Sequence, residues 1–88
     1  DFIEGGKGND TIRDSSGHNT FLFSGQFGND RVIGYQATDK LVFNDVAGSN
    51  DYRDHIKVVG GDTVIGFGTD SVTLVGVSSL SGEGIVIS

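Results

Sequence analysis

The 88-residue chain is long enough for one small domain, whose core is marginal unless a bound metal or another cross-link adds stability. It contains no cysteine, which excludes disulfide bonds, and its 12 acidic and 6 basic residues give a net charge of −6. This acidity argues against nucleic-acid binding, and no stretch approaches the about 20 apolar residues of a membrane-spanning helix.

The first recognisable unit is the segment Gly5–Arg13, which reads G-G-K-G-N-D-T-I-R and fits the repeat pattern G-G-x-G-x-D-x-U-x, where U is a large apolar residue. Its glycines reach positive φ values and bring backbone carbonyls close to an ion. Asp10 supplies a carboxylate oxygen, the type of ligand that calcium prefers. Thr11–Arg13 then reads as a short strand with Ile12 pointing inward. One unit therefore combines a calcium-binding turn with a strand.

The same pattern recurs on both sides of this unit at a spacing of nine residues. Asp1 precedes Asp10 by that spacing, and Asn19 follows it, with Gly17 in the position of Gly8. The alternative is a single Gly/Asn/Asp turn between two ordinary strands, which is disfavoured because the phase holds over three units. We therefore expect residues 1–24 to form the end of a repeat array.

After the array, short β-branched and aromatic runs alternate with turns, and no segment has the 3.6-residue periodicity of a helix beyond one helical turn near Tyr52–Asp54. A last echo of the repeat, offset by two residues, spans 25–33. We expect residues 25–88 to form an antiparallel β cap, with hairpin turns at 60–62 and 68–70. The strands expected are Thr20–Phe23, Arg31–Tyr35, Lys40–Phe43, His55–Val59, Thr63–Phe67, Ser71–Val77 and Ile85–Ile87.

Most of the large apolar side chains lie after Thr20, and we expect the hydrophobic core there. The residues expected to contribute are Phe43, Val58, Ile65, Phe67, Leu74 and Ile85.

Catalytic motifs are absent from the sequence, and we expect no catalytic residues in this segment. It has no Gly-x-Ser-x-Gly nucleophile elbow and no His-Glu-x-x-His zinc pattern. His18 and His55 are far apart and read as surface or turn residues. The pair Asp51 and Asp54 lies in a polar loop, where solvated carboxylates are a better interpretation than a glycosidase dyad.

With the nonapeptide and the later strands in view, the chain resembles the C-terminal end of repeats-in-toxin (RTX) proteins exported by bacterial type I secretion. Within that group it is most similar to the extracellular lipases of family I.3 and the related polyurethane-degrading esterases. The stretches that carry this resemblance are 28–36, 40–43, 62–65 and 70–77, and Val72-Thr73-Leu74-Val75-Gly76 points to the lipases.

The resemblance implies an all-β fold in which a parallel β-roll stub leads into an antiparallel, β-sandwich-like cap. It also implies Ca²⁺ as the cofactor, bound between turns two units apart. The neutral Asn19 departs from the pattern and should weaken its own site, whereas Asp30 matches the acidic position that closes the roll. The implied metal ligands are Asp1, Gly6, Gly8, Asp10, Gly17, Asn19 and Asp30.

A secretion signal at the C-terminus is the second implication, and its partner would be the ABC transporter complex of type I secretion. Such a protein is extracellular and has no N-terminal signal peptide. The upstream β-roll and the catalytic domain, which holds the family's Ser/His/Asp residues, would precede this segment in the same chain. The implied signal residues are Val72, Thr73, Leu74, Val75, Gly76, Glu83, Ile85, Val86 and Ile87.

Three functions remain open at this stage. The chain is the calcium-dependent folding and secretion module of a lipase, the tail of a serralysin-type metalloprotease, or a carbohydrate-binding R-module like those of alginate epimerases. The carbohydrate interpretation is disfavoured, because Tyr35 and Tyr52 are isolated and the basic residues are scattered. The upstream sequence would separate the lipase from the protease.

Overall fold

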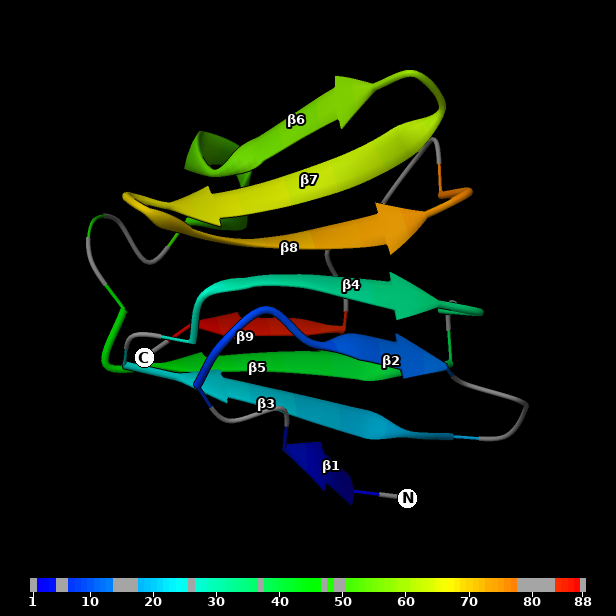
Figure 1. Cartoon of the computed structure of the whole chain (residues 1–88), viewed down its shortest axis with the longest axis horizontal. Helices are drawn as coiled ribbons and strands as arrows, with labels where there is room; N and C mark the ends of the chain where they lie inside the picture. The colour runs from blue at the N-terminus through cyan, green and yellow to red at the C-terminus, as the bar shows by residue number, and fades with distance from the viewer. Residues whose placement is uncertain are drawn as a thin grey trace.

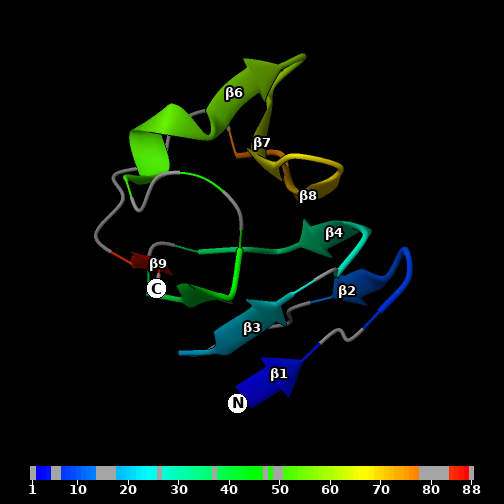
Figure 2. The same cartoon turned by 90° about the vertical axis from the view of Figure 1, so that its left-hand side faces the viewer.

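The computed structural model describes residues 2–4, 7–13, 18–25, 27–36, 38–46, 48, 51–77 and 84–87. Within them the chain forms two β-sheets that face each other (Figures 1 and 2) and one short 3-10 helix. The elements are β1 (Phe2–Glu4), β2 (Thr11–Arg13), β3 (Thr20–Ser24), β4 (Asn29–Ile33), β5 (Lys40–Asn44), η1 (Tyr52–Asp54), β6 (Ile56–Val59), β7 (Asp62–Phe67), β8 (Asp70–Val75) and β9 (Ile85–Ile87).

The first sheet has the strand order β1-β3-β5-β9, and all of its neighbours are parallel. Phe2 pairs with Thr20, a separation of 18 residues, as two nonapeptides per coil require. Thr20 pairs in turn with Lys40, a separation of 20 residues. The two residues that break the nine-residue phase in the sequence therefore lengthen the coil without breaking the stack.

The second sheet has the order β2-β4-β8-β7-β6. Its first three strands are parallel, and β8, β7 and β6 pair as an antiparallel meander. After β5 the chain leaves the roll through η1, forms β6 and β7, and returns as β8 beside β4 (Figure 1). The coil that ends in β8 therefore contains a complete hairpin.

The all-β class is confirmed, with one parallel sheet and one mixed sheet. The expected antiparallel pairing throughout residues 25–88 is wrong in its extent, because β4, β5 and β9 pair in parallel and only β6–β8 are antiparallel. Parallel pairing therefore continues past residue 24. Alternation of inward and outward side chains is the same in both kinds of ladder, so the sequence pattern does not distinguish them.

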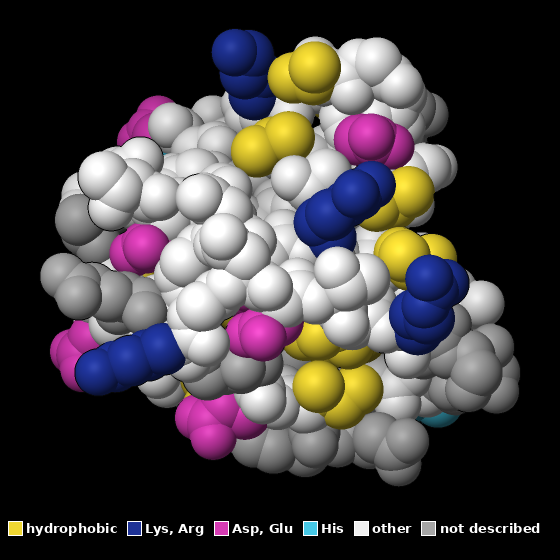
Figure 3. All heavy atoms as spheres, viewed as in Figure 1, with side chains coloured by type: hydrophobic (Ala, Val, Ile, Leu, Met, Phe, Trp, Pro, Cys, Tyr) yellow, Lys and Arg dark blue, Asp and Glu magenta, His cyan; other side chains and the backbone are white. Residues whose placement is uncertain are grey.

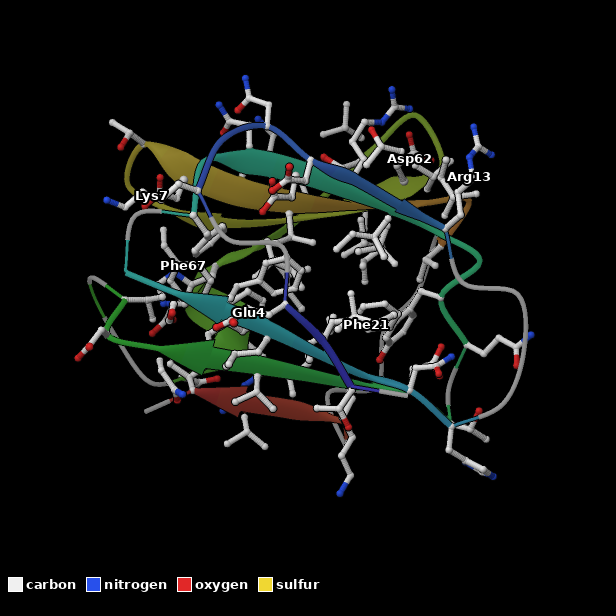
Figure 4. The ribbon with its side chains drawn as sticks, turned by 60° about the horizontal axis from the view of Figure 1, so that its bottom comes forward. Glu4, Lys7, Arg13, Phe21, Asp62 and Phe67 are labelled. Atoms are coloured by element: carbon white, nitrogen blue, oxygen red, sulfur yellow. The ribbon has the colours of Figure 1, made fainter. Side chains whose placement is uncertain are left out.

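The hydrophobic core fills the space between the sheets, where Phe21 and Phe67 lie in Figure 4 while Lys7 and Arg13 project outward. The Phe43 ring stacks on Phe23 with centroids 5.4 Å apart and lies 4.8 Å from Phe67. The fully or almost fully buried apolar residues are Phe21, Phe23, Phe27, Val32, Leu41, Phe43, Ile65, Phe67, Val72 and Leu74.

Four of the six expected core residues are buried, and Ile85 packs against the core from a half-buried position. The prediction that Val58 belongs to the core is wrong, since its side chain is 54% exposed on β6, the outermost strand of its sheet. Phe27 was not expected, because it lies in a turn between strands, yet it contacts three aromatic rings of the core. The helical turn at Tyr52–Asp54 is confirmed. β8 ends at Val75 rather than Val77, where Gly76 turns the chain with φ +78°.

Replacing Phe43 by Ala should lower the free energy of unfolding by about 3–5 kcal/mol, because it removes the ring that contacts aromatic neighbours from both sheets. Val86→Ala serves as the control, since Val86 is 49% exposed, and should cost about 0.5 kcal/mol. Denaturant unfolding at constant calcium concentration measures both. Equal costs for the two variants would contradict the assignment of the core.

Candidate metal centre

One edge of the molecule is built from two stacked turns, the one before β2 and the one before β4 (Figure 1). The register that pairs Thr11 with Arg31 places Asp10 beside Asp30 and Gly8 beside Gly28. Gly28 has φ +84°, and a Cβ atom there would overlap the carbonyl oxygen of Gly8. Only glycine permits this approach, so the stacking of coils requires the glycine that lies two residues before the Asp of the repeat.

Hydrogen bonds tie these two turns together. The N–H of Asp10 donates to Asp30 Oδ1 at 2.8 Å, and the N–H of Arg31 donates to the Asp10 carbonyl at 2.9 Å. The N–H of Asn29 donates to Asn9 Oδ1 at 2.9 Å. Donors from each turn thus bind acceptors on the other, and these hydrogen bonds hold Asp10 and Asp30 side by side.

The second carboxylate oxygens of this pair are not satisfied by the protein. Asp10 Oδ2 and Asp30 Oδ2 are both buried, and neither has a hydrogen-bond partner. Burial raises the pKa of the Asp30 carboxyl above its ordinary value, the N–H of Asp10 acts in the opposite direction, and the negative charges of Asp10 and Asp70 raise it further. Two adjacent carboxylates with unpaired buried oxygens are costly unless a cation lies between or beside them.

This donor set fits calcium, a hard cation that takes carboxylate and backbone carbonyl oxygens from flexible turns. Among the described residues, no three His, Cys, Asp or Glu side chains gather in a way that would hold a metal ion. A site at this edge therefore depends on backbone carbonyls as well as on Asp10 and Asp30. The turn at Gly8, with φ +97°, has the glycine-rich backbone that offers such carbonyls.

At the opposite edge, the buried carboxylate has hydrogen-bond donors for both of its oxygens. Asp39 is buried beside Asn19, and its Oδ1 accepts the N–H of Asn19 at 2.9 Å. Its Oδ2 accepts the N–H of Gln36 at 2.9 Å, so both oxygens have donors from the protein. The neighbour at the nonapeptide position is the neutral Asn19, which adds no second negative charge. The buried carboxylate at this edge is therefore satisfied by backbone donors.

Asp39 was not singled out from the sequence, although a signal was available. Asp30 follows Asp10 by twenty residues, and Asp39 follows Asn19 by the same interval. Twenty residues is the length of the longer coils. The match between Asn19 and Asp39 is therefore found only when the two-residue offset is applied to the strands of both sheets.

The structure brings three of the expected ligands, Gly8, Asp10 and Asp30, to one edge and places Asn19 on the other. Asp1, Gly6 and Gly17 lie outside the described residues. The ligand assignments themselves stay predictions.

The residues expected to form the secretion signal lie in two strands. Val72 and Leu74 are fully buried in β8, between β4 and β7, whereas Thr73 and Val75 are half-buried on the outer face. β9 pairs with β5 at the end of the parallel sheet, and Gly84 before it packs against the Asp39 carbonyl, where a Cβ would be 2.5 Å from that oxygen. Glu83 lies outside the described residues.

No helix in the described part of the chain is both long enough and apolar enough to cross a membrane.

Comparison with known proteins identifies the repeats at the start of the chain. Residues 1–26 match the RTX calcium-binding nonapeptide repeat family, so this part of the chain consists of RTX calcium-binding repeats. The presence of RTX repeats and calcium as their ligand are thereby confirmed.

The surrounding sequence is similar to that of bacterial lipases. The chain is 79% identical over 70 residues to a lipase of Pseudomonas fluorescens, which covers 77% of this chain and 15% of that protein. Its fold matches the crystal structure of the extracellular lipase LipA from Serratia marcescens with a TM-score of 0.91 and 42% identity, over 96% of this chain and 14% of LipA. The chain therefore spans about one seventh of the length of these two relatives.

Asp30→Asn should weaken calcium binding by about tenfold or more, because it removes a charged oxygen that has no donor in the protein. Asp39→Asn is the matched control: Asp39 also accepts the N–H of the residue twenty positions earlier, but both of its oxygens have donors. The control should cost about 1–3 kcal/mol of stability and leave calcium affinity unchanged. Titration calorimetry measures the affinities; an equal loss in both variants would refute the assignment of the edge.

Calcium should bind in preference to magnesium, because ligands on glycine-rich turns adapt to a large cation better than to the strict octahedron of magnesium. Asp10→Ala should remove more calcium binding than Asn19→Ala, since the Asp10 side chain carries a negative charge and the Asn19 side chain is neutral. Parallel titrations with the two metals test both points. Equal affinities for calcium and magnesium would rule this preference out.

Proposed function

We propose that this chain is the calcium-dependent folding and type I secretion module of an extracellular lipase, and that it contributes no catalytic residue itself. The observation that carries the proposal is the pair of unpaired buried oxygens on Asp10 and Asp30, which supports a fold that depends on a cation. The likeness to two lipases supports the kind of parent protein. Catalysis would belong to a domain upstream of the repeats.

Calcium would act as a folding switch across the bacterial envelope. Inside the cell, free calcium is far below the micromolar range of sensor sites, so Asp10 and Asp30 would repel each other without a cation. Outside, millimolar calcium would neutralise the pair, and the free energy of binding would become free energy of folding. The chain would thus stay unfolded during transit and fold on arrival.

The burial of the proposed signal fits a transporter that reads the unfolded chain. Val72 and Leu74 have no exposed surface in the folded protein, and the backbone of Ile85–Ile87 is paired with β5. Val72 and Leu74 are therefore accessible only before the sheets form, and the backbone of Ile85–Ile87 is unpaired only then, although the Val86 side chain stays 49% exposed. Folding outside the cell would therefore hide the segments that the transporter recognises and prevent return.

Two other functions fit less well. A carbohydrate-binding module for anionic glycans would need a continuous basic surface, whereas on the face seen in Figure 3 the Lys and Arg side chains are separated by hydrophobic and acidic ones. The tail of a serralysin-type metalloprotease would share these repeats, but the two relatives described above are lipases.

Export is tested with a passenger protein fused to the N-terminus of this chain, in cells that carry a type I secretion system. Polar replacement of Val72–Gly76, or deletion of Ile85–Ser88, should abolish secretion of the passenger. Phe43→Ala is the control, because it disrupts the core and leaves the sequence of both segments unchanged, and should leave secretion near the original level. Asp10→Ala should likewise permit transit but yield a loosely folded, protease-sensitive product.

The quantity of secreted passenger separates the outcomes. If Phe43→Ala blocks export as strongly as the signal variants, the transporter requires a fold and not a linear signal. If a fusion that lacks both C-terminal segments is secreted normally, the export role is excluded.

A further inference from the structure

The edge that carries Asp10 and Asp30 has a third layer, contributed by the start of β8. The register that pairs Asn29 with Ser71 places Asp70 beside Gly28, just as Gly28 lies beside Gly8. Asp70 Oδ1 accepts the N–H of Gly28 at 3.1 Å. The stack of turns therefore continues across a gap of about forty residues in the sequence.

Ser71 completes this layer. Its N–H donates to the Gly28 carbonyl at 2.9 Å, and its hydroxyl donates to Asn29 Oδ1 at 2.8 Å. The N–H of Asn29 in turn donates to Asn9 Oδ1, so the side chains of Asn9 and Asn29 link the three layers in series. The beginning of β8 is thus attached to the metal-binding turns by several short contacts, and not only by the ladder with β4.

The third layer also brings a third negative charge. The first two turns have glycine at this position, whereas β8 has Asp70. Besides burial, which is the main cause, the charges of Asp10 and Asp70 both raise the pKa of the Asp30 carboxyl. When the edge holds no cation, the Asp70 charge therefore adds repulsion that acts against the bond between Asp70 and the Gly28 N–H. With a cation at the edge, the same charge is attracted to the site.

We propose that Asp70 is a positioning residue that couples calcium occupancy of the Asp10–Asp30 edge to the docking of β8 onto β4. This rests on the calcium-dependent folding proposed above and gives it a specific route. β8 carries Val72 and Leu74, so calcium would bury the proposed transport signal by way of Asp70. No metal ligation by Asp70 is required, because its charge and its bond to Gly28 are sufficient.

The other end of the same strand provides a matched control. Asp62 Oδ1 accepts the N–H of Gly76 at 2.7 Å, just after β8 ends. Asp70 and Asp62 thus make the same kind of bond, a carboxylate to a glycine N–H, at opposite ends of one strand. Only Asp70 lies at the edge with the unpaired oxygens.

The test compares Asp70→Asn and Asp62→Asn in the 88-residue chain, with amide hydrogen exchange of Val72–Val75 followed in millimolar calcium and in chelator. An Asn side chain keeps an oxygen for the glycine N–H and removes the charge. In the original chain, calcium should slow amide exchange in β8. In Asp70→Asn, the ratio of the exchange rate in chelator to that in calcium should fall by on the order of tenfold, because exchange in chelator becomes slower. Asp62→Asn should keep the original ratio.

Each outcome decides the proposal. If Asp70→Asn retains the original ratio, or Asp62→Asn loses as much, the coupling through Asp70 is refuted. Asp70→Ser serves as a second neutral variant, and failure of both to fold even in calcium would also refute it, because removal of the charge is expected to favour docking. If the original chain shows no calcium response, the proposed function itself fails, which distinguishes the two.

Discussion

The structure depends on how buried carboxylates between successive coils are satisfied. At one edge Asp39 receives two N–H donors and faces a neutral Asn19, so it needs nothing from outside the protein. At the other edge Asp30 receives one N–H donor and faces Asp10, and each keeps a buried oxygen without a partner. Since an unpaired buried charge costs several kcal/mol, a cation bound at the second edge would contribute most to the stability of the fold. The same coil thus has one edge at which both oxygens of the buried carboxylate have N–H donors, and one at which each carboxylate keeps an oxygen without a donor.

The two edges are joined by an aromatic core that does not depend on the metal directly. Phe23, Phe27 and Phe43 pack together between the sheets, and Phe67 closes the cluster from β7. This burial stabilises the coils only when both sheets are present, because each short strand buries few side chains of its own. The electrostatic repulsion at one edge therefore reduces the free energy of folding that hydrophobic burial supplies to the whole domain. Cation binding at Asp10 and Asp30 can thus influence folding of both sheets.

The sequence allowed local features to be predicted better than the pairing of distant strands. The nonapeptide predicts the turn at Gly8–Asp10 and the strand that follows, because glycine and Asp act within a few residues. The parallel partners of β4 and β5 were missed, since β8 and β9 lie 42 and 44 residues away in register and alternation of side chains is the same in either direction. The exposure of Val58 also depends on strand order, which the sequence does not show. Its apolar side chain is exposed because β6 is the outermost strand of its sheet.

The order of the strands has a consequence for export from the C-terminus, as proposed for this chain. β8 and β9 would leave the transporter first, but they pair with β4 and β5, which leave later. Until the coils emerge, β9 therefore lacks its partner β5, and β8 has only its hairpin partner β7. Loop closure over some forty residues makes early parallel pairing costly. Once β4 is outside, Asp30 and the turn at Gly28 become available to calcium and to Asp70 together. Metal binding and burial of Val72 and Leu74 would then occur at the same stage, after the transporter has finished with them.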